Sequence, residues 1–142
     1  MPFLHSLKPF FKKYEGSFKW VGHKPQSELY KYYSQGSVFV MPSIQEGMAL
    51  VQLQAMACGL PLICTTNTGG EDLIVEGKSG YVVPIRNPNA LAERILYLYE
   101  NPRIREEMSN MAINRSKNFT WDNYGDKIIN IYENLFKSFK GK

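Results

Sequence analysis

Short apolar runs alternate along this chain with longer segments that have helical periodicity, and this alternation limits the folds open to it. Strand-like runs lie at residues 18–21, 38–41, 62–64 and 81–83. Helix-like segments separate and follow them, at residues 4–14, 27–33, 47–58, 71–75, 87–98, 103–117 and 120–137. Strands that are joined through helices lie parallel, with right-handed crossovers. The chain is therefore predicted to be an α/β protein with a parallel sheet and flanking helices.

Two segments are expected to be buried. The run 38–41 is apolar throughout and ends at Pro42, which suits a strand buried on both faces. The helix at 47–58 is apolar almost all round, with Gln52 and Gln54 as polar exceptions. The tail beyond residue 103 contains helices only, so it must pack on the sheet or on a partner.

Three residues are typical of helix starts. Ser27 is a candidate N-cap, Asn87 precedes a proline in its favoured first-turn position, and Thr120 precedes the last helix. We expect each of them to mark the beginning of its helix.

Size and composition suit one globular domain over residues 1–142. The chain is 44% hydrophobic and 21% charged, so it can bury a core. No apolar run approaches the roughly 18 residues of a spanning helix, and the N-terminus lacks the pattern of a signal peptide. We therefore expect a cytoplasmic protein in which Cys58 and Cys64 are buried, reduced thiols. With two histidines and no clustered ligands, a structural metal is not expected.

The charge balance is mildly basic, with 17 Lys and Arg against 13 Asp and Glu. Several of the lysines lie near the two ends of the chain, and a solvated surface is the preferred interpretation. Weak attraction to anionic lipid headgroups is the alternative, and it would place the protein at the inner face of the plasma membrane. Nucleic-acid binding is not expected, because no basic run is interleaved with aromatic residues.

Loop-forming residues follow three of the predicted strands, at 22–25, 42–47 and 65–70. Parallel sheets bind ligands at the carboxyl ends of their strands, so these loops are candidates for a site. The dinucleotide fingerprint G-x-G-x-x-G and the P-loop G-x-x-x-x-G-K-[ST] are both absent from the sequence. A dehydrogenase and a P-loop enzyme are therefore disfavoured.

The middle loop carries the most informative pattern. Glu46 precedes a predicted helix that starts at Gly47, and free N–H groups with the positive end of a helix dipole form a diphosphate site. Gly47 and Ala49 leave room for close backbone approach. Gln54 follows Glu46 by eight residues, about 12 Å along a helix, which spans the distance from a sugar to a ribose. The alternative is that Glu46 only complements the helix dipole and Gln54 lies at the surface.

Several longer segments share their order and spacing with a known family. They are F-K-W-V-G-H (18–23), S-E-L-Y-K-Y-Y (27–33), V-F-V-M-P-S-I-Q-E-G-M-A-L-V-Q-L-Q-A-M-A-C-G-L-P-L-I (38–63), G-G-E-D-L-I-V-E-G-K-S-G-Y-V-V-P (69–84), N-P-N-A-L-A-E-R-I (87–95) and F-T-W (119–121). From Phe18 to the end, the chain resembles the C-terminal domain of the large retaining glycosyltransferase family that includes sucrose synthases, mannosyltransferases and capsule enzymes. The resemblance implies a Rossmann-like domain, one half of a two-domain GT-B enzyme.

The resemblance also implies roles for individual residues. Glu46 would be the catalytic residue that contacts the donor sugar, in a motif of Glu, seven residues and Glu. Gln54 would contact the ribose of a UDP- or GDP-sugar, and no obligatory metal is implied. The remaining donor-binding positions would be the backbone groups that face the sugar, the diphosphate and the base, together with one loop serine: Gly47, Met48, Ala49, Leu50, Gly22, His23 and Ser43.

The chain departs from the family in two respects. Gln54 stands where the family usually has a second Glu, and it lacks the charge that strengthens a hydrogen bond to a hydroxyl. By the resemblance, the basic residues that neutralise the diphosphate and the N-terminal acceptor domain would both lie upstream of these residues. We therefore expect a donor-binding domain that is inactive alone and that serves bacterial polysaccharide or glycolipid synthesis, with membrane contact made through the acceptor. The alternative is a non-catalytic association module, which the aromatic-rich tail would suit.

Overall fold

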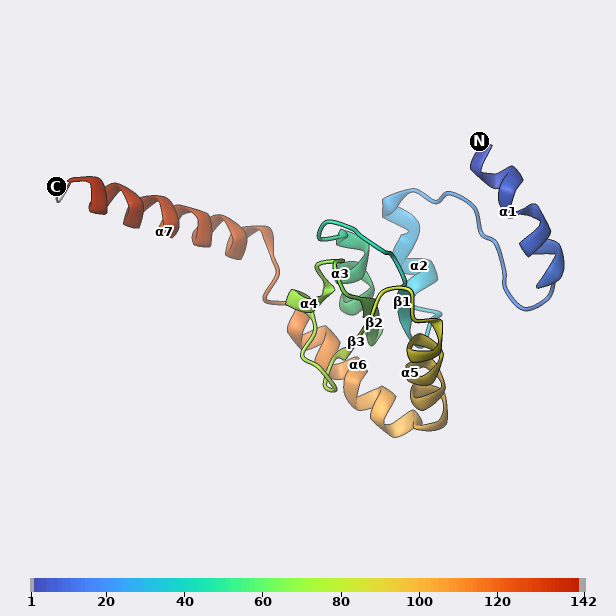
Figure 1. The fold of residues 1–142 in the computed structure, drawn as a ribbon. Helices are drawn as coiled ribbons and strands as arrows, with labels where there is room; N and C mark the ends of the chain where they lie inside the picture. Colours follow the sequence, from blue (N-terminus) through green and yellow to red (C-terminus); the bar gives the residue numbers. More distant parts are fainter. Residues whose placement is uncertain (1, 141–142) are drawn as a thin grey trace.

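The structure, a computed structural model, describes residues 2–140, and Figure 1 shows how its elements are arranged. In chain order they are α1 (Pro2–Lys13), η1 (Gln26–Glu28), α2 (Leu29–Tyr33), β1 (Phe39–Met41), α3 (Leu50–Ala57), β2 (Leu62–Thr65), α4 (Gly70–Leu73), β3 (Gly80–Val83), α5 (Pro88–Glu100), α6 (Pro102–Ser116) and α7 (Trp121–Lys140). The predicted α/β alternation is confirmed. We call the sheet and helices α2–α6 the body of the molecule.

A parallel three-stranded sheet, in the order β1-β2-β3, lies at the centre of the body. Phe39 aligns with Leu62 and Ile63 aligns with Tyr81. Helices α3 and α4 connect the successive strands, as the alternation of apolar runs predicted. Every residue of β2 is buried, whereas those of β1 are only half-buried. The prediction that 38–41 is buried on both faces was therefore wrong in degree, because in the described residues β1 pairs on one side only.

The predicted strand at 18–21 is not formed. These residues have no regular secondary structure and belong to the long connection that leads from α1 to α2. A strand needs a neighbour for its backbone groups, and Phe18 and Trp20 pack on Phe11 of α1 instead. The ring centroids lie 5.4 Å and 5.6 Å from that of Phe11. The apolar residues at 18–21 therefore contact a helix and do not add a strand to the sheet.

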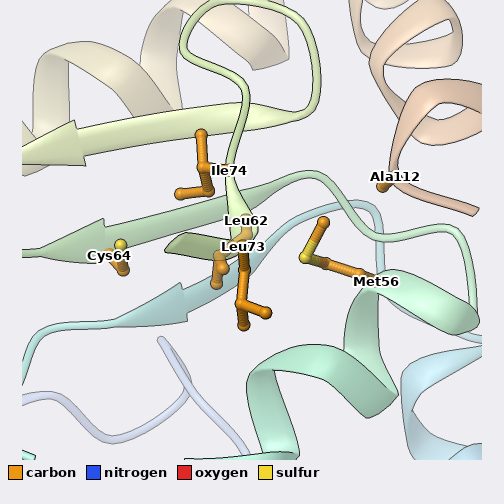
Figure 2. Close-up of a cluster of buried hydrophobic side chains, with 6 residues drawn as sticks. All are labelled: Met56, Leu62, Cys64, Leu73, Ile74 and Ala112. Carbon is orange, nitrogen blue, oxygen red and sulfur yellow. The ribbon is translucent and has the colours of Figure 1, made fainter. Parts of the chain in front are cut away.

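The core is divided between the two faces of the sheet, because successive side chains of β2 point to opposite sides. Leu62 and Cys64 lie on one face, while Ile63 lies on the other. Figure 2 shows the first cluster, which comprises Met56, Leu62, Cys64, Leu73, Ile74 and Ala112. The second comprises Ile63, Tyr81, Val83, Leu98 and Met108. Helices α3, α4 and α6 supply the first cluster, and α5 and α6 supply the second.

Two of the three predicted helix starts are confirmed. Asn87 Oδ1 accepts a hydrogen bond from Ala90 N (3.0 Å) at the start of α5. Thr120 Oγ1 accepts one from Asn123 N (3.1 Å) at the start of α7. Ser27 is not an N-cap, because the chain already turns one residue earlier and Ser27 lies inside η1.

The terminal helices extend away from the body (Figure 1). The apolar face of α7 is exposed to solvent, with exposed fractions of 68% for Tyr132 and 77% for Phe139. Of the helical tail, α6 packs against α3 and α5 and adds Met108 and Ala112 to the core, whereas α7 adds no described residue to it. In the region that the structure describes, no helix is long and apolar enough to cross a membrane.

Both cysteines are free. Cys64 is buried in β2, and burial raises the pKa of its thiol to about 11. Cys58 is only half-buried at the end of α3, so the prediction of two buried thiols holds for one of them.

Candidate functional site

Two loops leave the same edge of the sheet, since β1 and β2 are parallel neighbours. The loop after β1 spans residues 42–49, and the loop after β2 spans residues 66–69. Glu46 N donates to Asn67 O (2.9 Å), and Thr65 Oγ1 donates to Met41 O (3.2 Å) and to the carbonyl of Ser43. These bonds hold the first loop against the second.

The carboxylate of Glu46 lies at the exposed surface of this loop pair. Its Oε1 accepts a hydrogen bond from Ser43 Oγ (3.4 Å), so the structure brings these two predicted site residues together. The backbone of Glu46 is fixed through Asn67, while the outer part of its side chain faces solvent. Such a carboxylate is available to accept hydrogen bonds from hydroxyl groups of a ligand.

Helix α3 begins at Leu50, three residues later than predicted. Gly47, Met48 and Ala49 form a loop instead, and Ala49 is an extended N-cap whose side chain makes no capping hydrogen bond. The close packing of Gly69 explains the late start: a Cβ at Gly69 would lie only 2.9 Å from Met48 Cα. The N–H groups that open the helix therefore begin at Leu50, and no side chain caps them.

Gly47 has open space where a side chain would begin. A Cβ built on Gly47 meets no atom within 4 Å, and its backbone conformation is open to any residue. The fold itself therefore does not require glycine here.

The second loop is held by the carboxylate of Glu71, in the first turn of α4. Glu71 Oε1 accepts a hydrogen bond from Asn67 N (2.6 Å), where Asn67 adopts a positive φ of 67°. Partial burial acts to raise the pKa of Glu71, but backbone N–H groups of Glu71, Asn67, Thr68 and Gly69 lower it overall. No role for Glu71 was predicted from the sequence. Its position just after a Gly-Gly pair is the signal that it follows a tight loop.

Gln54 lies apart from the Glu46 loop. It lines a cavity of about 250 Å³ between α2 and α3, together with Gln26, Leu29, Tyr30, Tyr33, Ala57 and Cys58. The Oε1 atom of Gln54 is buried and, in the described residues, has no hydrogen-bond partner. Burial raises the pKa of the neighbouring Tyr33, with Cys58 adding to the effect. Gln54 thus lies on the same helix as Leu50, but it faces the cavity beside α2 and not the loop that contains Glu46.

Gly22 and His23 are exposed in the connection between α1 and η1. Gly22 has a positive φ of 67°, which turns the chain there. Within residues 2–140, no hydrogen bond joins Gly22 or His23 to Ser43, Glu46 or Gln54. The structure therefore gathers Ser43, Glu46 and 47–50 in one loop and the start of α3, whereas the described residues show no hydrogen bond from Gly22 or His23 to that loop. Among the described residues, no group of three or more His, Cys, Asp or Glu side chains could hold a metal ion.

The sequence profile of the family described as "Glycosyl transferases group 1" matches residues 6–115, most of the chain. This chain belongs to that family. The matched region includes both loops, all strands of the sheet and helix α3.

Individual relatives of this glycosyltransferase domain agree with the profile. The O-antigen chain mannosyltransferase B of Escherichia coli is 31% identical over 121 residues, which cover 85% of this chain and 31% of the relative. The structure of a sucrose-phosphate synthase from Thermosynechococcus elongatus matches with a TM-score of 0.81 and 28% identity, over 94% of this chain and 34% of that one. The pneumococcal O-GlcNAc transferase GtfA, solved with UDP and GlcNAc, matches with a TM-score of 0.73 and 25% identity, over 93% and 27%. The fold is thus that of GT-B glycosyltransferases.

This domain spans about a third of the length of the curated relatives that it matches. The resemblance seen in the sequence is therefore confirmed as a family relationship. The similarity covers one part of those longer enzymes.

Proposed function

We propose that this domain binds the nucleoside-diphosphate-sugar donor of a retaining glycosyltransferase. The observation that carries the proposal is the exposed carboxylate of Glu46 beside the uncapped start of α3. The Glu46 carboxylate can accept hydrogen bonds from the hydroxyls of a sugar, and the free N–H groups at the start of α3 can bind an anion. Ser43 orients the carboxylate, and Gly47 leaves space between the two features.

The diphosphate would lie at the start of α3. The first N–H groups of a helix have no partner within the helix, and the dipole adds positive potential there. The N-cap Ala49 supplies no side-chain acceptor, so a ligand anion meets no competitor from the cap. The backbone of Gly47 to Leu50 would then contact the sugar and the diphosphate, which would be stabilised as it leaves.

The relatives support the choice of ligand and of pathway. The pneumococcal transferase was solved with UDP, and the Escherichia coli relative is a mannosyltransferase of the O-antigen chain. We infer that the ligand here is a UDP- or GDP-sugar and that the complete enzyme acts in bacterial polysaccharide or glycolipid synthesis. A separate acceptor domain would form the other wall of the cleft, and peripheral membrane contact would come through the acceptor. Because positioning of two reactants supplies much of the rate enhancement, the domain alone would not transfer sugar.

Calorimetric titration of the domain with UDP, GDP and UDP-glucose tests the binding site. Gly47→Ala places a methyl group in the proposed ligand space, and we expect it to weaken nucleotide affinity by about tenfold, or about 1.4 kcal/mol. Gly125→Ala is the matched control, because a Cβ there also meets no atom within 4 Å but lies on α7. Equal affinity of the Gly47→Ala and Gly125→Ala proteins would contradict the proposal.

The role of Glu46 is tested in a complete enzyme that contains this domain. Loss of a charged hydrogen bond costs about 1.5–3 kcal/mol, so Glu46→Gln should lower turnover by roughly tenfold to a hundredfold. Affinity for the free nucleoside diphosphate should change little, because the sugar is absent from it. A variant that keeps its turnover at saturation and loses affinity for UDP would place Glu46 at the nucleotide instead.

The contact of Gln54 with the ribose is a separate part of the proposal. Its buried Oε1 has no partner among the described residues, which suits an acceptor that receives a ligand hydroxyl. The domain should then bind UDP more tightly than 2′-deoxy-UDP by several-fold, and Gln54→Met should abolish that preference. A preference that survives in Gln54→Met would remove Gln54 from the ribose.

The exposed aromatic face of α7 favours a second candidate function, association with another chain. Trp121 and Tyr132 are 76% and 68% exposed, respectively. A domain that binds none of the nucleotides above but forms oligomers in sedimentation experiments would favour this alternative over donor binding.

A further inference from the structure

A fully buried amide lies behind the proposed site. Gln52, in the first turn of α3, has an exposed fraction of 0%, and its Nε2 donates to Thr68 O (2.8 Å). A carbonyl only accepts hydrogen bonds, so this contact fixes the orientation of the amide. Gln52 therefore ties α3 to the loop after β2.

The loop continues this connection to Glu46. Thr68 is also fully buried, and its Oγ1 donates to Thr65 O (2.7 Å). Thr65 Oγ1 in turn donates to the carbonyls of Met41 and Ser43. Between them, Asn67 O accepts the N–H of Glu46 (2.9 Å). A continuous set of polar contacts thus runs from the interior of α3 to the backbone of the exposed carboxylate residue.

The amide is retained at a cost in stability. In the described residues the Oε1 of Gln52 is buried without a hydrogen-bond partner, and leaving a buried polar atom unpaired destabilises the folded state. An apolar side chain of similar volume would avoid that cost. The loop is also shaped around this side chain, since a Cβ on Gly70 would lie 2.8 Å from Oε1. Core packing alone does not call for glutamine here.

We propose that Gln52 is a positioning residue, which holds the loop at 66–69 in the one arrangement that places Glu46 for the donor sugar. Gln52 itself is inaccessible to any ligand and touches neither sugar nor nucleotide. The inference rests on the proposed role of Glu46. It adds that the sugar contact depends on a side chain in the interior of the domain.

Amide hydrogen exchange of the domain tests the positioning directly. Gln52→Met keeps the volume of the side chain and removes the donor to Thr68. We expect the amide of Glu46 to exchange about tenfold faster, while that of Ile63 in β2 stays unchanged, because the opening is local. Gln35→Met is the matched control, since it makes the same change at an exposed position outside the proposed site, where the amide donates to Lys31 O (2.6 Å).

A binding measurement separates positioning from a merely structural role. In Gln52→Met, affinity for UDP-glucose should fall by at least about fivefold relative to affinity for UDP, because only the sugar contact depends on Glu46. Thr68→Val removes the next hydrogen bond at nearly constant volume and should change both readouts in the same direction. It serves as the test if Gln52→Met does not fold.

The outcomes are distinguishable. Unchanged exchange at Glu46, or equal acceleration at Glu46 and Ile63, would overturn the positioning role of Gln52. A wild-type domain that binds no nucleotide sugar would overturn the proposed function, while the exchange data would still decide whether Gln52 holds the loop.

Discussion

The body and helix α7 are both rich in apolar residues, but they differ in what covers those residues. In the body, Leu62, Ile63 and Leu98 have exposed fractions of 0%. On α7, Ile131 and Leu135 remain 54% and 50% exposed, although the helix has apolar residues at three- and four-residue spacing. Figure 1 shows the cause, because α7 leaves the body and runs along none of its elements.

This difference shows that amphipathic spacing in a sequence identifies the apolar face of a helix but does not identify the element that covers this face. The body closes on itself, since β2 has strands on both sides and helices over both faces. Only the first turns of α7 meet the body, where Trp121, Tyr124 and Lys127 line a groove with Met48, Leu50 and Leu53. The free energy of unfolding of this chain should therefore come from the body.

The largest expected effect follows from truncating equivalent side chains in the two regions. Leu62→Ala should lower the free energy of unfolding by about 2–5 kcal/mol, because it leaves a cavity in the core. Leu135→Ala should change it by less than about 0.5 kcal/mol, as exposed substitutions do. Chemical denaturation of both variants measures this. Comparable losses in the two variants would show that α7 is buried in solution.

A pair of glycines gives the next contrast. Gly80 in β3 lies so close to the backbone of Leu62 in β2 that an added Cβ would overlap it. Gly80→Ala should therefore cost about 1–3 kcal/mol as the strands are forced apart. Gly125→Ala meets open space on α7 and should increase helix content, since glycine disfavours helix interiors by about 0.5–1 kcal/mol. Chemical denaturation measures the loss of stability in Gly80→Ala, and far-ultraviolet circular dichroism measures the gain of helix content in Gly125→Ala. A Gly80→Ala protein as stable as the wild type would contradict the close approach of Gly80 to Leu62.

Local patterns were sufficient to predict most of the body. The runs at 38–41, 62–64 and 81–83 became strands because helices connect them and neighbours pair with them. The run at 18–21 has the same apolar character but packs on Phe11, and only tertiary structure distinguishes the two outcomes.

The candidate site was predicted in part. Glu46 and Ser43 lie together in the loop that follows β1, because loop position after a parallel strand is readable from sequence. The start of α3 was predicted three residues too early, since the packing of Gly69 on Met48 joins segments about twenty residues apart in sequence. The importance of Gln52 depends on Thr68 for the same reason. A contact between two segments that are distant in sequence leaves no local pattern from which it could be predicted.

Two carboxylates, Glu71 in the body and Glu133 on α7, give a third contrast, with a smaller expected effect on stability than the glycines. The native state lowers the pKa of Glu71 below its ordinary value of 4.5, so the contribution of Glu71 to stability is fully present above about that pH. It should disappear as the pH falls through the native pKa. Glu71→Gln should therefore be less stable than the wild type at neutral pH and approach it in acid. Glu133→Gln, which breaks only an exposed pair with Lys137 (3.9 Å), should show no such trend in denaturation at a series of pH values. A pH-independent deficit in Glu71→Gln would contradict the lowered pKa.

A truncation of α7 is the largest change to the chain, but it should have the smallest effect on the free energy of unfolding. Ending the chain after Lys127 removes the part of α7 that lies beyond the groove, including Ile131, Tyr132, Leu135 and Phe139. These side chains are at least half exposed, so their removal takes little apolar area from the folded state. An isolated helix segment of this length is marginal in water and adds little cooperativity. We expect the free energy of unfolding to stay within about 0.5 kcal/mol of the full chain, with helix content falling in proportion to the residues removed. A large loss of stability would mean that α7 folds back on the body in solution, and the contrast between the two regions would then disappear.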